Sequence, residues 1–134
     1  MAVGISPALP LTVDEIDGPY RLTKTIAEAM QQNFKHLILT NPGERVMDPD
    51  FGVGIRRYLF ELVESDVRDM IKNRIRKQVS KYLPMIKVYD ISFGDGSTDP
   101  ADAVTIEEGH TLYVKITYSI PTIKVGNVLE IPLQ

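Results

Sequence analysis

The 134-residue sequence contains no cysteine. Disulfides, thiolate nucleophiles and cysteine-based zinc sites are therefore excluded, which suits a protein that folds in a reducing cytosol. No run of apolar residues approaches the roughly 18 that would span a bilayer, so we expect no membrane insertion. The first residues are mildly apolar, but prolines interrupt them and no basic residue precedes them, which argues against a secretory signal.

A strong charge of either sign is also missing. The formal net charge is −3, which is too small to predict nucleic acid or an anionic membrane as the main partner. Hydrophobic residues make up 43% and charged residues 25%, an ordinary soluble composition. The length favours a single domain over residues 1–134 with room for one core.

Signals for metal, cofactor or catalytic chemistry are scarce. His36 and His110 are the only histidines, and neither has a partner at the spacing that a metal site needs. Residues 95–99 are faintly similar to a calcium loop but lack its spacing and its terminal glutamate. The sequence has no glycine-rich phosphate loop and no Gly-x-Ser-x-Gly motif. We therefore predict no metal, no cofactor, no small-molecule substrate and no catalytic residue.

Helical periodicity dominates the first two thirds of the chain. Residues 1–19 are rich in proline and glycine and are predicted to form an extended N-terminal arm. A helical part should cover residues 20–83, with a first helix over 20–40. A short helix is expected over 55–63 and a longer one over 65–83, where acidic residues come first and basic residues last.

After residue 83, apolar and polar residues alternate with period two, which predicts an antiparallel sheet over residues 86–133. Its strands are expected over 86–93, 112–120 and 128–133, with a hairpin turn over 124–127 before the last one. Because helices precede strands in this order, the predicted class is α+β, with N-terminal helices packed on a small C-terminal antiparallel β-sheet.

Three side chains of the first predicted strand, Tyr89, Ile91 and Phe93, should share one face of that sheet. The connection over residues 94–109 is long, polar and acidic.

The loop over residues 40–54 carries the most specific motif. It reads Thr-Asn-Pro-Gly-Glu-Arg, a short spacer, then Pro-Asp-Phe-Gly, and a Leu-Phe pair follows at residues 59–60. This ordered set, with helices on both sides, resembles the contractile-tail baseplate wedge family (tail protein W, lysozyme-like). That family includes phage sheath initiators and the related type VI secretion baseplate subunit.

The resemblance implies a non-enzymatic structural protein of a phage tail baseplate or a related injection machine, in the virion and assembled in the host cytoplasm. It implies docking on the wedge and templating of the first sheath ring by strand addition. The implied partners are other baseplate wedge subunits and first-ring sheath subunits. The implied docking residues are Pro42, Gly43, Glu44, Arg45, Pro49, Phe51, Gly52 and Phe60. The sheet positions implied for strand addition are Leu112, Val114, Ile116, Tyr118, Val128, Leu129 and Ile131.

Other interpretations stay open on the residues alone. The loop can also be interpreted as a turn with only a structural role, because Gly43 allows the chain to leave a helix in a left-handed conformation and Pro49 fixes the path of the backbone. The family's lysozyme label suggests a peptidoglycan hydrolase, yet nothing marks two of the nearby acids as the carboxyl pair that glycoside hydrolysis needs. A stand-alone peptide-binding module that uses a sheet edge is the third alternative.

Overall fold

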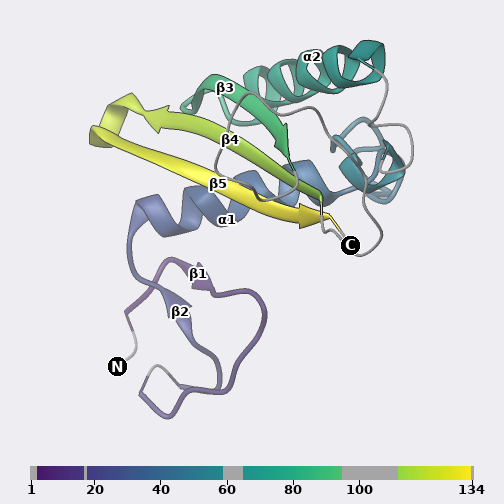
Figure 1. Ribbon diagram of the computed structural model, residues 1–134. Helices are drawn as coiled ribbons and strands as arrows, with labels where there is room; N and C mark the ends of the chain where they lie inside the picture. The colour runs from purple at the N-terminus through teal and green to yellow at the C-terminus, as the bar shows by residue number, and fades with distance from the viewer. Residues whose placement is uncertain (1–2, 17, 59–64, 95–111, 134) are drawn as a thin grey trace.

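The computed structural model describes residues 3–16, 18–58, 65–94 and 112–133 (Figure 1). Two helices and two antiparallel sheets make up its regular structure. The elements, in chain order, are β1 (Ser6–Pro7), β2 (Leu22–Thr23), α1 (Ile26–Leu39), the 3₁₀ helix η1 (Ile55–Tyr58), α2 (Ser65–Tyr82), β3 (Lys87–Gly94), β4 (Leu112–Ile120), the 3₁₀ helix η2 (Pro121–Ile123) and β5 (Val125–Leu133).

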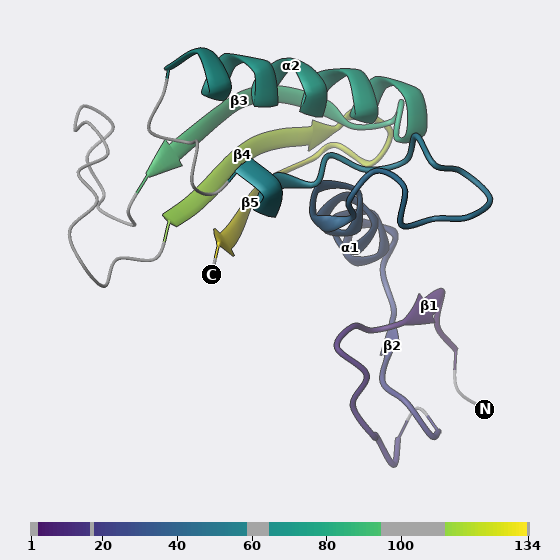
Figure 2. The ribbon, with the colours of Figure 1, turned by 90° about the vertical axis from the view of Figure 1, so that its right-hand side faces the viewer.

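The α+β composition holds, but the predicted arrangement of N-terminal helices packed on a small C-terminal antiparallel sheet is wrong. The strand pair β1–β2 precedes α1, so the helices occupy the middle of the chain and a second sheet begins it. Figure 2 shows this pair on the far side of α1 from the three-stranded sheet. Period-two alternation could not reveal it, because each strand is only two residues long.

Helix α1 begins later than the predicted residue 20, because a capping box starts it. The Thr25 hydroxyl accepts a hydrogen bond from the backbone N–H of Glu28. The Glu28 carboxylate accepts in return from the N–H groups of Lys24 and Thr25, which lowers the pKa of that carboxyl. This exchange satisfies helix-end donors that would otherwise lack partners. Leu22 and Thr23, expected in the helix, belong to β2 instead.

One hydrophobic core joins both helices, the loop after α1 and the three-stranded sheet, whose order is β3-β4-β5. The predicted alternation of β4 places four side chains on the buried face: Val114, Ile116, Tyr118 and Ile120. The ring of Phe34 from α1 meets the ring of Tyr118 edge to face at 5.1 Å between centroids, a favourable aromatic geometry.

Strand β3 changes face at a β-bulge, which corrects the prediction that Tyr89 shares a face with Ile91. Val88 pairs with Tyr118 and Asp90 pairs with Thr117, so Tyr89 is the extra residue. An extra residue reverses the alternation of the side chains on its strand. Ile91 is consequently buried, whereas Tyr89 is 65% exposed.

The connection between β4 and β5 also differs from the prediction. It runs through η2 and ends at Lys124, which has a left-handed backbone with φ of 52°. Strand β5 therefore begins at Val125, inside the turn predicted over 124–127, and is nine residues long. Its register with β4 is continuous from Ile120↔Val125 to Leu112↔Leu133.

The N-terminal segment, residues 3–16 and 18–23, folds back on itself. The backbone N–H of Ile5 donates to the Thr23 carbonyl, and that of Ala8 donates to the Arg21 carbonyl. The side chain of Gln32 on α1 joins the segment to the body by bonding the Pro7 carbonyl and the Leu9 N–H. The segment is thus a paired hairpin-like unit at its base.

Candidate functional site

The loop that carries the motif, residues 40–54, is called the motif loop below. It leaves α1 at Thr40 and returns to that helix, where the N–H of Val53 donates to the Leu37 carbonyl at 3.0 Å. Its own neck is closed by a hydrogen bond of 2.8 Å from the Gly43 N–H to the Pro49 carbonyl. The loop therefore has a closed base, from which residues 44–48 project.

Gly52 brings the two ends of the motif loop into contact. Its φ is +109°, which side chains rarely tolerate, and a Cβ there would overlap the Thr40 carbonyl oxygen. Helix α2 holds both polar backbone groups of this glycine. Its N–H donates to Gln78 Oε1 at 3.0 Å, and its carbonyl accepts from Arg74 Nη2 at 3.2 Å.

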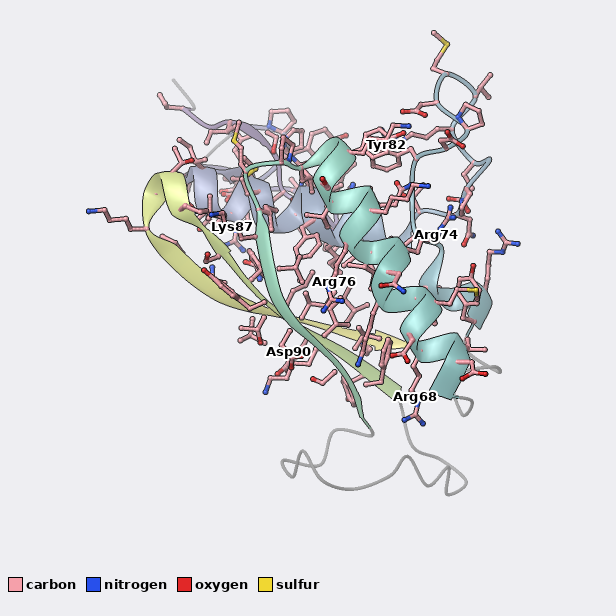
Figure 3. The ribbon with its side chains drawn as sticks, turned by 90° about the horizontal axis from the view of Figure 1, so that it is seen from above. Arg68, Arg74, Arg76, Tyr82, Lys87 and Asp90 are labelled. Carbon is pink, nitrogen blue, oxygen red and sulfur yellow. The ribbon has the colours of Figure 1, made fainter. Side chains whose placement is uncertain are left out.

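Gln78 is the main connection between the motif loop and α2. It is only 6% exposed, and its amide also donates to the Asp50 carbonyl at 3.0 Å. One buried side chain thus satisfies a donor and an acceptor of the loop, as buried polar groups require. Figure 3 shows labelled Arg74 and Tyr82 on the side of α2 that faces this loop.

Glu44 acts inside the motif loop. Its carboxylate accepts from the backbone N–H of Asn41 at 3.0 Å and from the Asn41 side-chain amide at 2.8 Å. The N–H of Glu44 donates back to the Asn41 carbonyl. This reciprocal set fixes the turn that Pro42 and Gly43 form.

Arg45 lies on top of an aromatic column. Its guanidinium carbon is 3.7 Å from the centre of the Phe51 ring, and that ring meets Tyr82 edge to face at 4.9 Å. The Tyr82 hydroxyl donates a hydrogen bond of 2.9 Å to Asp48, so this α2 residue contacts the motif loop at a second point. Glu44 and Arg45, although adjacent, therefore have different partners.

The projecting part of the motif loop is apolar at its tip. Val46 and Met47 are 94% and 96% exposed, more than any other large hydrophobic side chain in the part of the chain that the structure describes. Two adjacent exposed apolar side chains on a loop with several internal hydrogen bonds make this tip a candidate contact surface.

Most predicted docking residues thus lie together in one loop. Phe51 is buried, Pro42 is half-buried, and Gly43, Glu44, Arg45 and Pro49 are exposed. Phe60, and the acid Glu61 beside it, lie outside the described residues. Gln78 was not predicted from the sequence, although a signal existed: it is a polar residue at the helical spacing of Ile71, Ile75 and Tyr82.

The predicted sheet residues divide between two faces. Val114, Ile116, Tyr118, Leu129 and Ile131 are buried, so they belong to the core, whereas Val128 is 44% exposed on the opposite face. Leu112 begins β4 and pairs with Leu133. In the three-stranded order β3-β4-β5, the two free edges belong to β3 and β5.

The described residues include no group of three or more His, Asp or Glu side chains that could hold a metal ion. None of the described helices is long and apolar enough to cross a membrane. Near the loop, Asp48 accepts from Tyr82, and Asp50 lies 3.7 Å from the Lys81 ammonium group. The adjacent Tyr82 side chain is the largest influence that raises the pKa of Lys81.

Residues 24–124 match the family model of the baseplate wedge protein gp25. A proposed tail lysozyme from Geobacter sulfurreducens, known from a crystal structure, is similar in fold, with a TM-score of 0.63 and 24% identity over 84% of this chain and 93% of that one. A chain of the six-fold symmetrised anti-feeding prophage baseplate has a TM-score of 0.62 and 25% identity over 84% of this chain and 82% of that one. A search of curated proteins found no match.

Proposed function

The chain belongs to the family of the baseplate wedge protein gp25, and from this premise we propose that its motif loop docks on the wedge while its sheet templates the first sheath ring. The membership identifies a baseplate component of a contractile injection system. A similar chain also forms part of the anti-feeding prophage baseplate. The proposed location is the tail baseplate, and the proposed partners are other wedge subunits and first-ring sheath subunits.

The observation that carries the docking proposal is the rigid, projecting motif loop. Hydrogen bonds made by Asn41, Glu44 and Gln78 hold the backbone of the loop in place without a neighbour. What it turns outward is the Arg45 side chain and the apolar tip of Val46 and Met47. An arginine beside exposed apolar side chains is a common composition for the centre of a protein–protein interface.

The three-stranded sheet supports the templating proposal. A free strand edge offers unpaired N–H and carbonyl groups to an incoming strand. Strand addition relies on backbone hydrogen bonds and depends little on side-chain identity. Such a joint suits a first layer from which identical subunits can continue.

Arg45→Ala tests the docking proposal. The cation–π contact with Phe51 is at the surface, so its loss should lower the free energy of unfolding by only about 0.5–1 kcal/mol. Recovery of the variant in assembled particles should fall at least tenfold, as expected of an interface arginine worth more than about 1.4 kcal/mol. Thermal melting of the isolated chain and quantitative immunoblotting of purified particles give the two values.

Arg76→Ala is the matched control, because Arg76 is an exposed arginine on the side of α2 that faces β3 (Figure 3). It should melt and assemble like the unmodified chain. An Arg45→Ala chain that is unfolded in isolation would show that Arg45 is a structural brace, and the docking role would be rejected.

Family membership supports a structural rather than an enzymatic role. Hydrolysis of a glycoside requires one carboxylic acid and one carboxylate on either side of the sugar. In the motif loop, Glu44 and Asp48 accept internal hydrogen bonds, and Asp50 lies within salt-bridge distance of Lys81. These acids already serve the loop's own structure.

We therefore expect no turnover of peptidoglycan by the unmodified chain, and no change in Glu44→Gln or Glu61→Gln. Release of reducing sugar from purified cell wall, with hen egg-white lysozyme as the positive control, provides the measurement. Reproducible hydrolysis that either substitution abolishes would overturn the structural assignment.

A further inference from the structure

Methionine supplies all the sulfur in this chain, because the sequence contains five methionines and no cysteine. In proteins that have an exposed cysteine, its thiolate is usually the first group that a peroxide oxidises. Here the thioethers are the sulfur targets that remain, and a thioether reacts only as fast as solvent gives the oxidant access to it. The exposure of each methionine therefore predicts the order in which they are oxidised.

Met47 is by far the most accessible methionine in the described ranges, which include all five except Met1. Its side chain is 96% exposed, compared with 54% for Met85 and 50% for Met70. Met30 is partly buried and packs against the hydrophobic core. One methionine thus stands apart from the others, and it lies at the tip of the motif loop.

The motif loop holds Met47 in this outward position. The hydrogen bond across the neck of the loop closes it at its base, and the next residue, Asp48, is held by the Tyr82 hydroxyl. Val46 on the other side is 94% exposed, so the neighbour of Met47 is apolar and leaves its sulfur open to solvent. A small oxidant can reach this sulfur without any change in the fold.

We propose that Met47 is a modification site, at which oxidation by hydrogen peroxide switches off the docking of the motif loop. One oxygen atom is transferred: the S–O bond forms, the O–O bond of the peroxide breaks, the sulfur loses two electrons, and the peroxide is reduced to water. The product, methionine sulfoxide, is polar. Its oxygen weakens an apolar contact when it enters that contact without a hydrogen-bond donor.

The switch rests on the proposed function, whereas the site of oxidation does not. Oxidation of Met47 should leave the fold intact, because this side chain lies outside the core. The oxidised chain should therefore melt within a few degrees of the unmodified one. Because methionine sulfoxide reductases reverse the reaction, the loss of docking is recoverable.

Peptide mass spectrometry of the full-length chain after brief treatment with dilute hydrogen peroxide tests the site. Sulfoxide should accumulate several times faster at Met47 than at Met70 or Met85, and most slowly at Met30. Oxidation of Met70 or Met85 as fast as Met47 overturns the assignment of the site.

The switch is tested with the treated chain, freed of peroxide and added to baseplates that assemble without their own copy. Its recovery in particles should fall at least about tenfold, and methionine sulfoxide reductase should restore it. Met47→Leu keeps an apolar side chain of similar size that peroxide does not oxidise, so this variant should be incorporated equally before and after treatment. Met85→Leu is the matched control and should lose recovery on treatment, as the unmodified chain does.

Normal recovery of a chain whose Met47 is oxidised overturns the switch, as does an equal loss on treatment of Met47→Leu. If Met47→Leu is itself not incorporated, a half-oxidised sample of the unmodified chain decides: Met47 sulfoxide should be depleted in the incorporated fraction, and equal sulfoxide in both fractions overturns the switch.

Treatment of baseplates that are already assembled separates this proposal from the docking proposal. Met47 should then be protected from peroxide. A Met47 that reacts as fast in the baseplate as in the free chain would overturn docking through this tip, and the switch with it, while leaving the oxidation site in place.

Discussion

Gly52→Ala should lower the free energy of unfolding by about 3 kcal/mol or more, from the combined cost of left-handed strain and a steric overlap. The φ of +109° is unfavourable for alanine, and the new Cβ would overlap the Thr40 carbonyl oxygen, which belongs to backbone and cannot rotate away. Relief requires the motif loop to separate from Thr40, which also lengthens the bonds from Gly52 to Gln78 and Arg74. Differential scanning calorimetry should show a midpoint about 10 °C lower.

Gly43→Ala separates the cost of backbone strain from the cost of the steric overlap. Gly43 also has a positive φ, +92°, but no atom lies within 4 Å of the position that its Cβ would take. Only the backbone strain remains, so the expected loss is about 1–2 kcal/mol. Equal losses for the two variants would show that the contact with Thr40 is not the reason for glycine at residue 52.

Phe34→Ala should lower the free energy of unfolding by about 3–5 kcal/mol, the usual range for a buried phenylalanine. Phe34 is fully buried between α1 and β4, and its ring contacts Tyr118 edge to face. The cavity would form where helix and sheet meet, so neither element can close it alone. Because small domains have only about 5–15 kcal/mol of stability, this loss is a large share of the total, and the melting midpoint should fall by about 10 °C or more.

Ile26→Ala provides the comparison on the same helix. Ile26 is 55% exposed, so its truncation should change the free energy of unfolding by about 0.5 kcal/mol or less. Urea titration followed by circular dichroism gives both values. A loss below about 1.5 kcal/mol for Phe34→Ala would mean that the helix–sheet contact contributes less than its burial indicates.

The elements with long periodic patterns could be predicted from the sequence. The apolar stripe of α2 and the alternation of β4 depend on local spacing alone, and their observed bounds, Ser65–Tyr82 and Leu112–Ile120, agree closely with the predicted ones. The start of α1 was predictable as well, because Thr25 and Glu28 have the spacing of a capping box. Periodicity alone placed that start too early, since Leu22 continues the apolar stripe.

Features that depend on distant partners could not be predicted. Tyr89 looks like a regular strand residue until its cross-strand partners are known, because a bulge is a property of two strands. The pairing of β1 with β2 joins residues about 17 positions apart over only two pairs. In the motif loop, the sequence indicated that Gly52 matters, but only the approach of Thr40 explains why.

The internal bonding of the motif loop has a consequence for the speed of assembly. A flexible loop has to lose conformational entropy when it binds, which typically costs about 0.5–1.5 kcal/mol for each ordered side chain. Here Glu44, Gln78 and the column from Arg45 to Tyr82 impose that order before any partner arrives. In the proposed docking on a wedge subunit, an encounter then needs only the correct orientation, so association rates should approach the range of rigid protein pairs, about 10⁵–10⁷ M⁻¹s⁻¹.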